Sequence, residues 1–158
     1  MRPILLLLLS LLLVSSSCNK PEDDKYVADA LVFGTYHGMC ASNCVDMYEI
    51  RYSTMAKDDS VKYTDLTWNY TFKTYRLIAK TKQQIAVQLL SEVPKELFAN
   101  GATTYGSPDS HDQGGVYLEV KSIPGNYKFK LDMDDTPDQS DEVKAFKQKV
   151  LTVLRQIQ

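Results

Sequence analysis

The sequence predicts an α+β domain with a mainly antiparallel sheet, on which a C-terminal amphipathic helix and a central helical segment are packed. Two observations indicate this class. Several segments alternate apolar and polar residues with the period of two that is typical of half-buried strands, and two others repeat apolar residues at helical spacing. The segments follow the order strands, helix, strands, helix, with short turns instead of regular crossovers between the strands.

The first strands are expected in residues 30–33 and 45–52. Residues 30–33 are a short apolar run, and the second segment places Tyr48, Ile50 and Tyr52 on one face. The clearest alternation lies in residues 63–72, which we expect to form a half-buried antiparallel strand. The side chains of its apolar face are Leu66, Trp68, Tyr70 and Phe72.

A hairpin is predicted over residues 116–133. Val116, Leu118 and Val120 alternate with polar or aromatic neighbours, and Pro124-Gly125-Asn126 follows. Pro-Gly suits the centre of a type II turn. Alternation then resumes in a second set, which consists of Tyr127, Phe129, Leu131 and Met133.

The central helical segment is expected to begin near Thr81. Thr81 and Gln84 have the spacing of a capping box, which satisfies free amide groups at a helix start. Pro94 can then start a second short helix through Phe98. The apolar residues at helical spacing in the first part are Ile85, Ala86, Leu89 and Leu90.

The C-terminal helix is predicted from an apolar stripe that begins after Thr136-Pro137-Asp138-Gln139, which resembles a cap, a first-turn proline and a capping partner. The stripe comprises Val143, Phe146, Val150, Val153, Leu154 and Ile157. We expect the basic residues to stay outside it; these are Lys144, Lys147, Lys149 and Arg155.

The N-terminus has the features of an export signal. Met1 and Arg2 provide a short positive region, and residues 4–14 are an almost uninterrupted apolar run that is shorter than the roughly 20 residues needed to span a bilayer. Small residues, Ser15-Ser16-Ser17, precede Cys18. This pattern resembles the lipobox of bacterial lipoproteins, although Ser15 stands where the family usually has Leu or Val. An ordinary signal peptide cut elsewhere is the alternative.

The resemblance to small bacterial envelope lipoproteins implies a division of the chain into three parts. Residues 1–17 would be removed, Cys18 would carry the lipid, such as palmitate, and residues 18–25 would form a polar tether. Residues 26–158 would form one globular α+β domain. The implied location is the bacterial cell envelope, where the lipid anchors the protein to the outer membrane, on its periplasmic or its surface face.

The charge of the mature chain argues against nucleic acid as a partner. Loss of Arg2 lowers the number of Lys and Arg residues from 18 to 17, while the 20 Asp and Glu residues remain. Binding to phosphates requires a clustered excess of cations, which a mildly acidic protein does not provide. The partner that we expect instead, at an exposed face of the sheet or at the loop over residues 100–115, is an envelope protein or a glycan.

The first candidate site is the loop that contains Cys40 and Cys44. If the flanking segments pair as a hairpin, the two cysteines lie within disulfide range, and an oxidising envelope favours the bond. The pair could instead be a reversible redox couple, or could bind Zn or Cu(I) with His37. Cys-x3-Cys resembles the cysteine spacing of certain envelope copper chaperones, and the resemblance covers the spacing alone.

The second candidate site is the long polar loop over residues 100–115. Long loops in compact domains are often functional, and its glycines permit close approach of a backbone or a ligand. A solvated surface loop is the alternative. If His111 converges with the cysteine loop, a four-ligand metal site becomes possible. The candidate binding residues are Tyr105, His111, Asp112, Gln113, Gly114 and Gly115.

Two hypotheses of function remain from the sequence. The first is a non-catalytic, membrane-anchored binding module without a cofactor; phosphate-cradle, nucleophile-elbow and zinc-protease motifs are absent, and we assign no catalytic residue. The second is a metal-binding (Zn or Cu) or thiol-redox lipoprotein that uses Cys40 and Cys44. The sequence leaves open whether the protein is an enzyme, and favours the first hypothesis.

Overall fold

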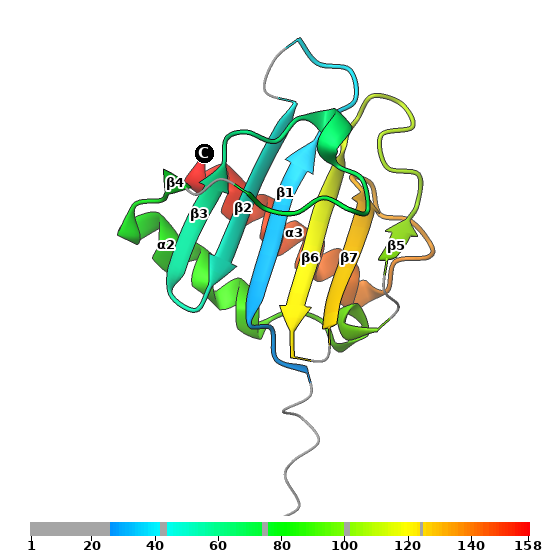
Figure 1. Ribbon diagram of the computed structural model, residues 1–158. Helices are drawn as coiled ribbons and strands as arrows, with labels where there is room; N and C mark the ends of the chain where they lie inside the picture. The colour runs from blue at the N-terminus through cyan, green and yellow to red at the C-terminus, as the bar shows by residue number, and fades with distance from the viewer. Residues whose placement is uncertain (1–25, 42–43, 74–75, 100–101, 124) are drawn as a thin grey trace, which may run out of the picture.

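The centre of the computed structural model, which describes residues 26–41, 44–73, 76–99, 102–123 and 125–158, is a seven-stranded mixed sheet (Figure 1). The strand order is β4-β3-β2-β1-β6-β7-β5, and every neighbouring pair is antiparallel except the parallel pair of β5 and β7. The strands are β1 (Ala30–Tyr36), β2 (Val45–Arg51), β3 (Thr54–Asp58), β4 (Arg76–Leu77), β5 (Ala102–Tyr105), β6 (Gly115–Ser122) and β7 (Gly125–Asp132). The predicted α+β class is confirmed.

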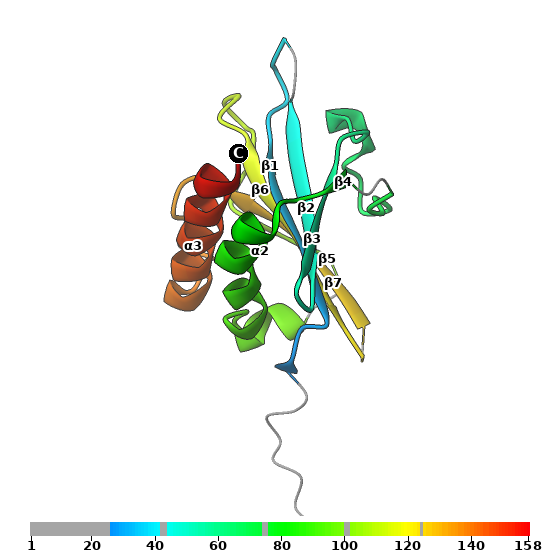
Figure 2. The ribbon, with the colours of Figure 1, turned by 90° about the vertical axis from the view of Figure 1, so that its left-hand side faces the viewer.

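Two helices lie side by side on one face of the sheet (Figure 2). Helix α2 (Lys80–Ala86) continues into the 3₁₀ helix η4 (Val87–Ser91), which η5 (Lys95–Phe98) follows, and the C-terminal helix is α3 (Asp141–Ile157). The main core lies between these helices and the sheet residues Phe33, Leu118 and Phe129, all of them fully buried. The predicted apolar stripe of α3 is confirmed, because all six of its residues are buried.

The opposite face of the sheet is crossed by residues 59–73, which we call the strap (Figures 1 and 2). Its only regular element is the 3₁₀ helix η3 (Tyr63–Asp65), so the predicted strand over 63–72 is wrong. Leu66, Tyr70 and Phe72 are nevertheless buried in a second, smaller core against this face, whereas Trp68 is 38% exposed.

The side chains of the strap alternate between buried and exposed like those of a strand, although its backbone pairs with no strand. A segment that lies flat on a sheet also turns every second side chain toward it. Its carbonyl oxygens accept hydrogen bonds from ammonium groups instead of from a neighbouring strand. Lys128 Nζ donates to the carbonyls of Trp68 and Tyr70, each at 2.8 Å, and Lys130 Nζ donates to that of Leu66 at 2.7 Å.

The structure also tests the predicted hairpin over residues 116–133 and the predicted face of residues 45–52. The hairpin of β6 and β7 is confirmed, but Gly125 is the first residue of β7 and lies opposite Ser122, so it does not occupy the centre of the turn as predicted. Pro124 lies outside the described residues. Tyr52 does not extend the face of β2, because the strand ends at Arg51 and Tyr52 turns outward with φ 53° and 71% exposure.

The predicted helix starts are displaced. Helix α2 begins at Lys80 after Ala79, so Thr81 lies inside its first turn and forms no cap. Helix α3 begins at Asp141, where the Ser140 hydroxyl accepts a hydrogen bond from the Val143 amide at 3.1 Å. Thr136 does not cap the helix, because its hydroxyl donates to Asp138 in the preceding turn, at 2.5 Å.

Lys147 is the clearest departure from the expected burial, because it lies inside the apolar stripe of α3 with 0% exposure. It is four residues after Val143 and three before Val150, and therefore shares their face of the helix. Its ammonium group donates to the carbonyl oxygens of Asp132 at 3.0 Å and Asp134 at 2.7 Å, and it pairs with the Asp135 carboxylate at 3.0 Å. Burial of the charge is thus compensated by oxygen ligands from the turn before the helix.

The predicted signal peptide, Cys18 and the tether lie outside the described residues. Within the part of the chain that the structure describes, no helix combines the length and the apolar character required to cross a membrane.

Candidate functional site

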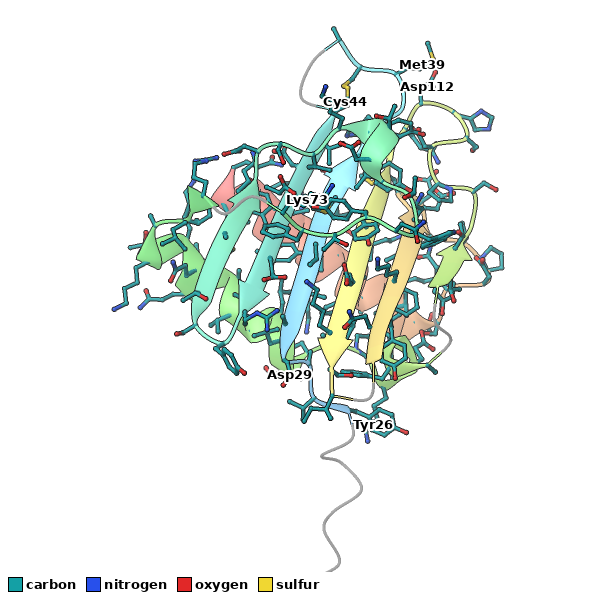
Figure 3. All side chains as sticks on the ribbon, viewed as in Figure 1. Tyr26, Asp29, Met39, Cys44, Lys73 and Asp112 are labelled. Atoms are coloured by element: carbon teal, nitrogen blue, oxygen red, sulfur yellow. A yellow bond between two sulfur atoms is a disulfide. The ribbon has the colours of Figure 1, made fainter. Side chains whose placement is uncertain are left out.

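The two loops that the sequence singles out meet at one end of the sheet, which we call the disulfide end. Tyr63 of the strap also reaches this end, where its hydroxyl donates to the Asp109 carboxylate at 2.8 Å. Gly38 packs against Asp109, and Gly114 packs so closely on His37 that a side chain at position 114 would overlap the imidazole. Figure 3 shows Met39, Cys44 and Asp112 together at this end.

Two of the six predicted binding-loop residues, Gln113 and Gly114, hold the loop in place. Gln113 donates to the Asp132 carboxylate at 2.9 Å. Tyr105 is not a loop residue as predicted, because it ends strand β5 within the range 100–115, and its ring stacks on Phe129. The Asp109 carboxylate accepts the Gly114 amide at 3.1 Å, while the Asp109 amide donates to the Gly114 carbonyl at 2.9 Å. The remaining members differ: Gly115 begins β6 in a buried position, and His111 and Asp112 are exposed near the tip.

Cys40 and Cys44 are joined by a disulfide, with their Cα atoms 5.6 Å apart. The bond closes the turn between β1 and β2, where the His37 amide donates to the Cys44 carbonyl at 2.8 Å. His111 is not brought into a metal centre with this loop, since the described residues contain no cluster of three or more His, Cys, Asp or Glu side chains that could hold an ion. The zinc or copper alternative therefore remains a prediction for a reduced state.

Beside the disulfide lies an open hollow of about 1240 Å³, which we call the groove. Its walls come from the ends of β2 and β3, from β4, from the start of the strap and from the C-terminal end of α3. Apolar positions such as Val61, Leu77 and Ile78 alternate with charged ones along these walls. The charged residues that line it are Asp46, Lys57, Asp58, Asp59, Lys62, Arg76 and Lys82.

Ion pairs are formed by charged residues that line the groove. Lys57 Nζ lies 2.5 Å from Asp46 Oδ1, and Arg76 forms a two-pronged pair with Asp59. Burial alone would lower the pKa of Lys57, but the hydrogen bond to Asp46 and the nearby negative groups raise it above its ordinary value. The hydrogen bond from Arg76 lowers the pKa of the Asp59 carboxyl. The pKa shifts of Lys57 and Asp59 thus both favour the charged forms of these two side chains.

Asp58 anchors the strap at the edge of the groove. One carboxylate oxygen accepts the amide and the hydroxyl of Ser60, at 2.9 and 2.7 Å; the other accepts the Tyr70 hydroxyl at 3.1 Å and the Lys73 amide at 3.2 Å. Burial raises the pKa of Asp58, but these hydrogen bonds outweigh it and lower the pKa. Sequence reasoning did not identify Asp58, although Asp followed two residues later by Ser is typical of a side-chain-stabilised turn.

A second hollow, of about 450 Å³, lies on the helix side of the same end. It is lined by His37, Met133 and Arg155, and it shares Cys44, Asp46 and Gln158 with the groove. Gln158 donates to the Asp46 carboxylate at 3.3 Å, so the last residue of the chain forms part of the wall between the hollows. His37 thus faces the smaller hollow and is not among the residues of the groove.

Two buried polar groups beneath the strap were also missed from the sequence. The Tyr117 hydroxyl and Glu119 Oε2 have no hydrogen-bond partner among the described residues. Burial raises the pKa of the Glu119 carboxyl, and Glu49 adds to this, although Lys121 and Lys128 oppose it. Neither residue lines the groove or the smaller hollow, so the groove is the stronger candidate site.

Replacing Cys44 by serine is expected to lower the free energy of unfolding only modestly. A disulfide that closes a five-residue loop stabilises a protein by about 2 kcal/mol or less, because it removes little entropy from the unfolded chain. Urea unfolding followed by Trp68 fluorescence, with the Cys40→Ser, Cys44→Ser double variant as control for the free thiol, measures the loss. A much larger loss in both variants would show that the bond shapes the groove instead of merely closing a turn.

The groove is the candidate site that the sheet, the strap and α3 form together. The residues that line the groove come from two distant parts of the chain, between Gly38 and Lys82 and at Ile157 and Gln158, so its shape depends on how α3 packs beside β2 and β3. No protein-family model matches the chain, and no curated protein and no solved structure shows a significant similarity to it.

Proposed function

We propose that the protein is an exported lipoprotein, acylated on Cys18, whose domain binds an extended segment of another envelope protein in the groove. The groove is the observation that carries this proposal. Its volume of about 1240 Å³ exceeds the roughly 300–1,000 Å³ of a site for one small molecule, and it is open to the surface. The groove is lined by both charged and apolar side chains, and a peptide can contact both kinds with its own polar groups and apolar side chains.

The charges of the groove favour binding over catalysis. General acid–base catalysis at neutral pH requires a group whose pKa lies near the working pH. Here the pKa of Lys57 is raised and those of Asp58 and Asp59 are lowered, so each is held more firmly in its charged form. Such groups exchange partners with a charged ligand more readily than they transfer protons.

The edge of the sheet gives the partner a place to pair. β4 is the last strand on this side, and Leu77 is 72% exposed. The Ile78 amide donates to Met55 of β3, and alternation in an antiparallel ladder then directs the Leu77 amide and carbonyl away from β3. A partner strand can hydrogen bond to these groups, as in other cases of strand addition.

The position of the groove also agrees with an anchored protein. The described chain enters at Tyr26, at the end of the sheet opposite Cys44 (Figure 3). A lipid on Cys18 would therefore hold the domain by one end and leave the groove at the other, where it is accessible to a partner.

The test compares Leu77→Pro with Leu77→Ala. Both shorten the side chain, but only proline removes the outward amide, and the hydrogen bond from Ile78 to β3 is left in place. Peptides are selected from a displayed random library on the lipidated full-length protein in detergent, and their affinities are measured by fluorescence anisotropy. We expect Leu77→Pro to weaken binding about tenfold, the equivalent of a main-chain hydrogen bond, and Leu77→Ala to weaken it less.

Two results would contradict this proposal. If the selected peptides bind both variants equally well, the edge of β4 is not their site. If no peptide binds and peptidoglycan oligosaccharides do, the ligand is a glycan, and the groove then acts through side chains alone.

A thiol-redox or metal function is the second candidate. It is favoured by the exposure of Cys40 and by the position of Cys44 on the walls of both hollows, next to His37. Native and denatured masses of protein purified without reductant or chelator distinguish the states. A denatured mass that lacks two hydrogens, without a native adduct, excludes bound metal; free thiols and a metal-sized native increment would favour the second candidate over the first.

A further inference from the structure

Three apolar side chains are exposed at the end of the sheet where the described chain begins, which we call the tether end. Ile123, in the turn between β6 and β7, is 95% exposed; Tyr52, in the turn between β2 and β3, is 71% exposed; and Val27 is 59% exposed. Both turns lie at the end where the chain enters (Figure 1), and Figure 3 places Tyr26 and Asp29 there.

The strand register brings these side chains to one level. Ala30 of β1 lies between Arg51 of β2 and Lys121 of β6, and the Asp29 amide donates to the Lys121 carbonyl at 2.8 Å. One step further along each strand therefore places Asp29 between Tyr52 and Ser122. Val27 and Ile123 lie just beyond this row, so the three apolar side chains share the outermost layer of the tether end.

The nearby charges do not make this end a basic patch. Lys121 pairs with Glu49 at 2.5 Å, and Arg51 approaches the same carboxylate at 3.6 Å. Asp29 adds a negative group, and Lys95, whose Nζ lies 5.6 Å from the centre of the Tyr26 ring, adds a positive one. Because the charges nearly balance, attraction to a surface at this end must come from the apolar side chains and not from anionic lipid.

We infer that the tether end rests on the membrane, with Ile123, Tyr52 and Val27 inserted into the interfacial layer of the bilayer. This inference depends on the proposed lipid anchor at Cys18. Eight residue steps separate Cys18 from Tyr26, so the anchor keeps this end within about 29 Å of the lipid surface and makes its contact with lipid effectively intramolecular. Tyrosine is suited to such an interface because its ring is apolar and its hydroxyl is polar. The groove then faces away from the membrane.

The experiment places a reporter at each end of the domain. Ile123→Trp and, as the matched control, Met39→Trp are made in a Trp68→Phe background, so that each protein contains one tryptophan. Both sites are exposed, at 95% and 76%, so neither change disturbs the core. The lipidated full-length proteins are reconstituted in phosphatidylcholine vesicles that contain brominated acyl chains, with the lipid on Cys18 verified by mass.

We expect bromine to quench the tryptophan at position 123 and its emission to shift to shorter wavelength, while the tryptophan at position 39 remains accessible to acrylamide in water. Equal, weak bromine quenching at both positions of a lipidated protein would overturn the inference and leave the proposed binding function intact. A mass without lipid on Cys18 would overturn both, because the inference requires the anchor.

Discussion

Lys147→Met should lower the free energy of unfolding by about 2–4 kcal/mol, a large fraction of the stability of a small domain. Methionine preserves the length and the apolar stem of the side chain, so no cavity forms in the core. It removes the donor for the carbonyl oxygens of Asp132 and Asp134, which lie at the end of β7 and in the turn that leads to α3. Each buried acceptor left without a donor costs about 1–3 kcal/mol.

The matched control is Lys149→Met on the same helix. The Lys149 side chain is 55% exposed and pairs with Glu92 at 3.1 Å, and a solvent-exposed pair of this kind contributes about 1 kcal/mol or less. Urea midpoints of the two variants, measured by far-ultraviolet circular dichroism, therefore separate burial from charge. Equal midpoints would mean that the turn carbonyls find water when the ammonium group is absent.

Lys147 also illustrates where the sequence pattern was sufficient and where its interpretation failed. The spacing from Val143 and to Val150 places residue 147 on the buried face, and the expectation of an exposed residue came from its charge alone. Periodicity follows from backbone geometry, and here it indicates the correct face of the helix for residue 147. The compensating oxygen ligands come from the preceding turn, whose conformation depends on the packed fold and has no local signal.

The fold was predictable where burial and strand pairing coincide. The strands β2, β6 and β7 and the stripe of α3 follow from periodicity, because each of these elements packs one face on the main core, and β1 follows from its apolar run, which is buried on both faces. The shorter strands β3, β4 and β5 were not predicted. In the strap, burial and pairing are separate: Tyr70 and Phe72 are buried, yet the backbone is held by lysine side chains from β7. Alternation reports which side chains are buried, and it cannot distinguish these two arrangements.

The site was predictable only in part, for a related reason. Gly and Cys clusters identified the loops around Cys40 and Gly114, and the fold brings these loops together. The groove itself depends on Lys57, Asp59 and Arg76, which are ordinary charged residues in sequence. Their role arises from the alignment of β2, β3 and β4, which places Lys57 opposite both Tyr48 and Arg76. Pairing across strands is a tertiary property that no local pattern encodes.

Gly34→Ala should lower the free energy of unfolding by about as much as Lys147→Met and should also impair the groove. Gly34 lies in the central strand β1, opposite Met47 of β2 and Tyr117 of β6. A methyl group there would overlap the backbone carbonyl oxygen of Asp46 and lie 2.8 Å from the sulfur of Met47. Because the first of these neighbours is backbone, β2 itself must move, and we expect a loss of about 3 kcal/mol, the upper part of the usual range for overpacking.

Gly125→Ala is the control, since its nearest neighbours would be 3.8 Å from the new methyl group, an ordinary contact distance. Its stability should change by about 1 kcal/mol or less. Asp46 pairs with Lys57 in the groove and accepts from Gln158, so a shift of β2 disturbs both contacts. Gly34→Ala should therefore also weaken the binding of selected peptides, under conditions in which the variant is still folded. Peptide affinity equal to that of Gly125→Ala would show that the wall at Asp46 contributes no contact, and would place the binding surface nearer the β4 edge.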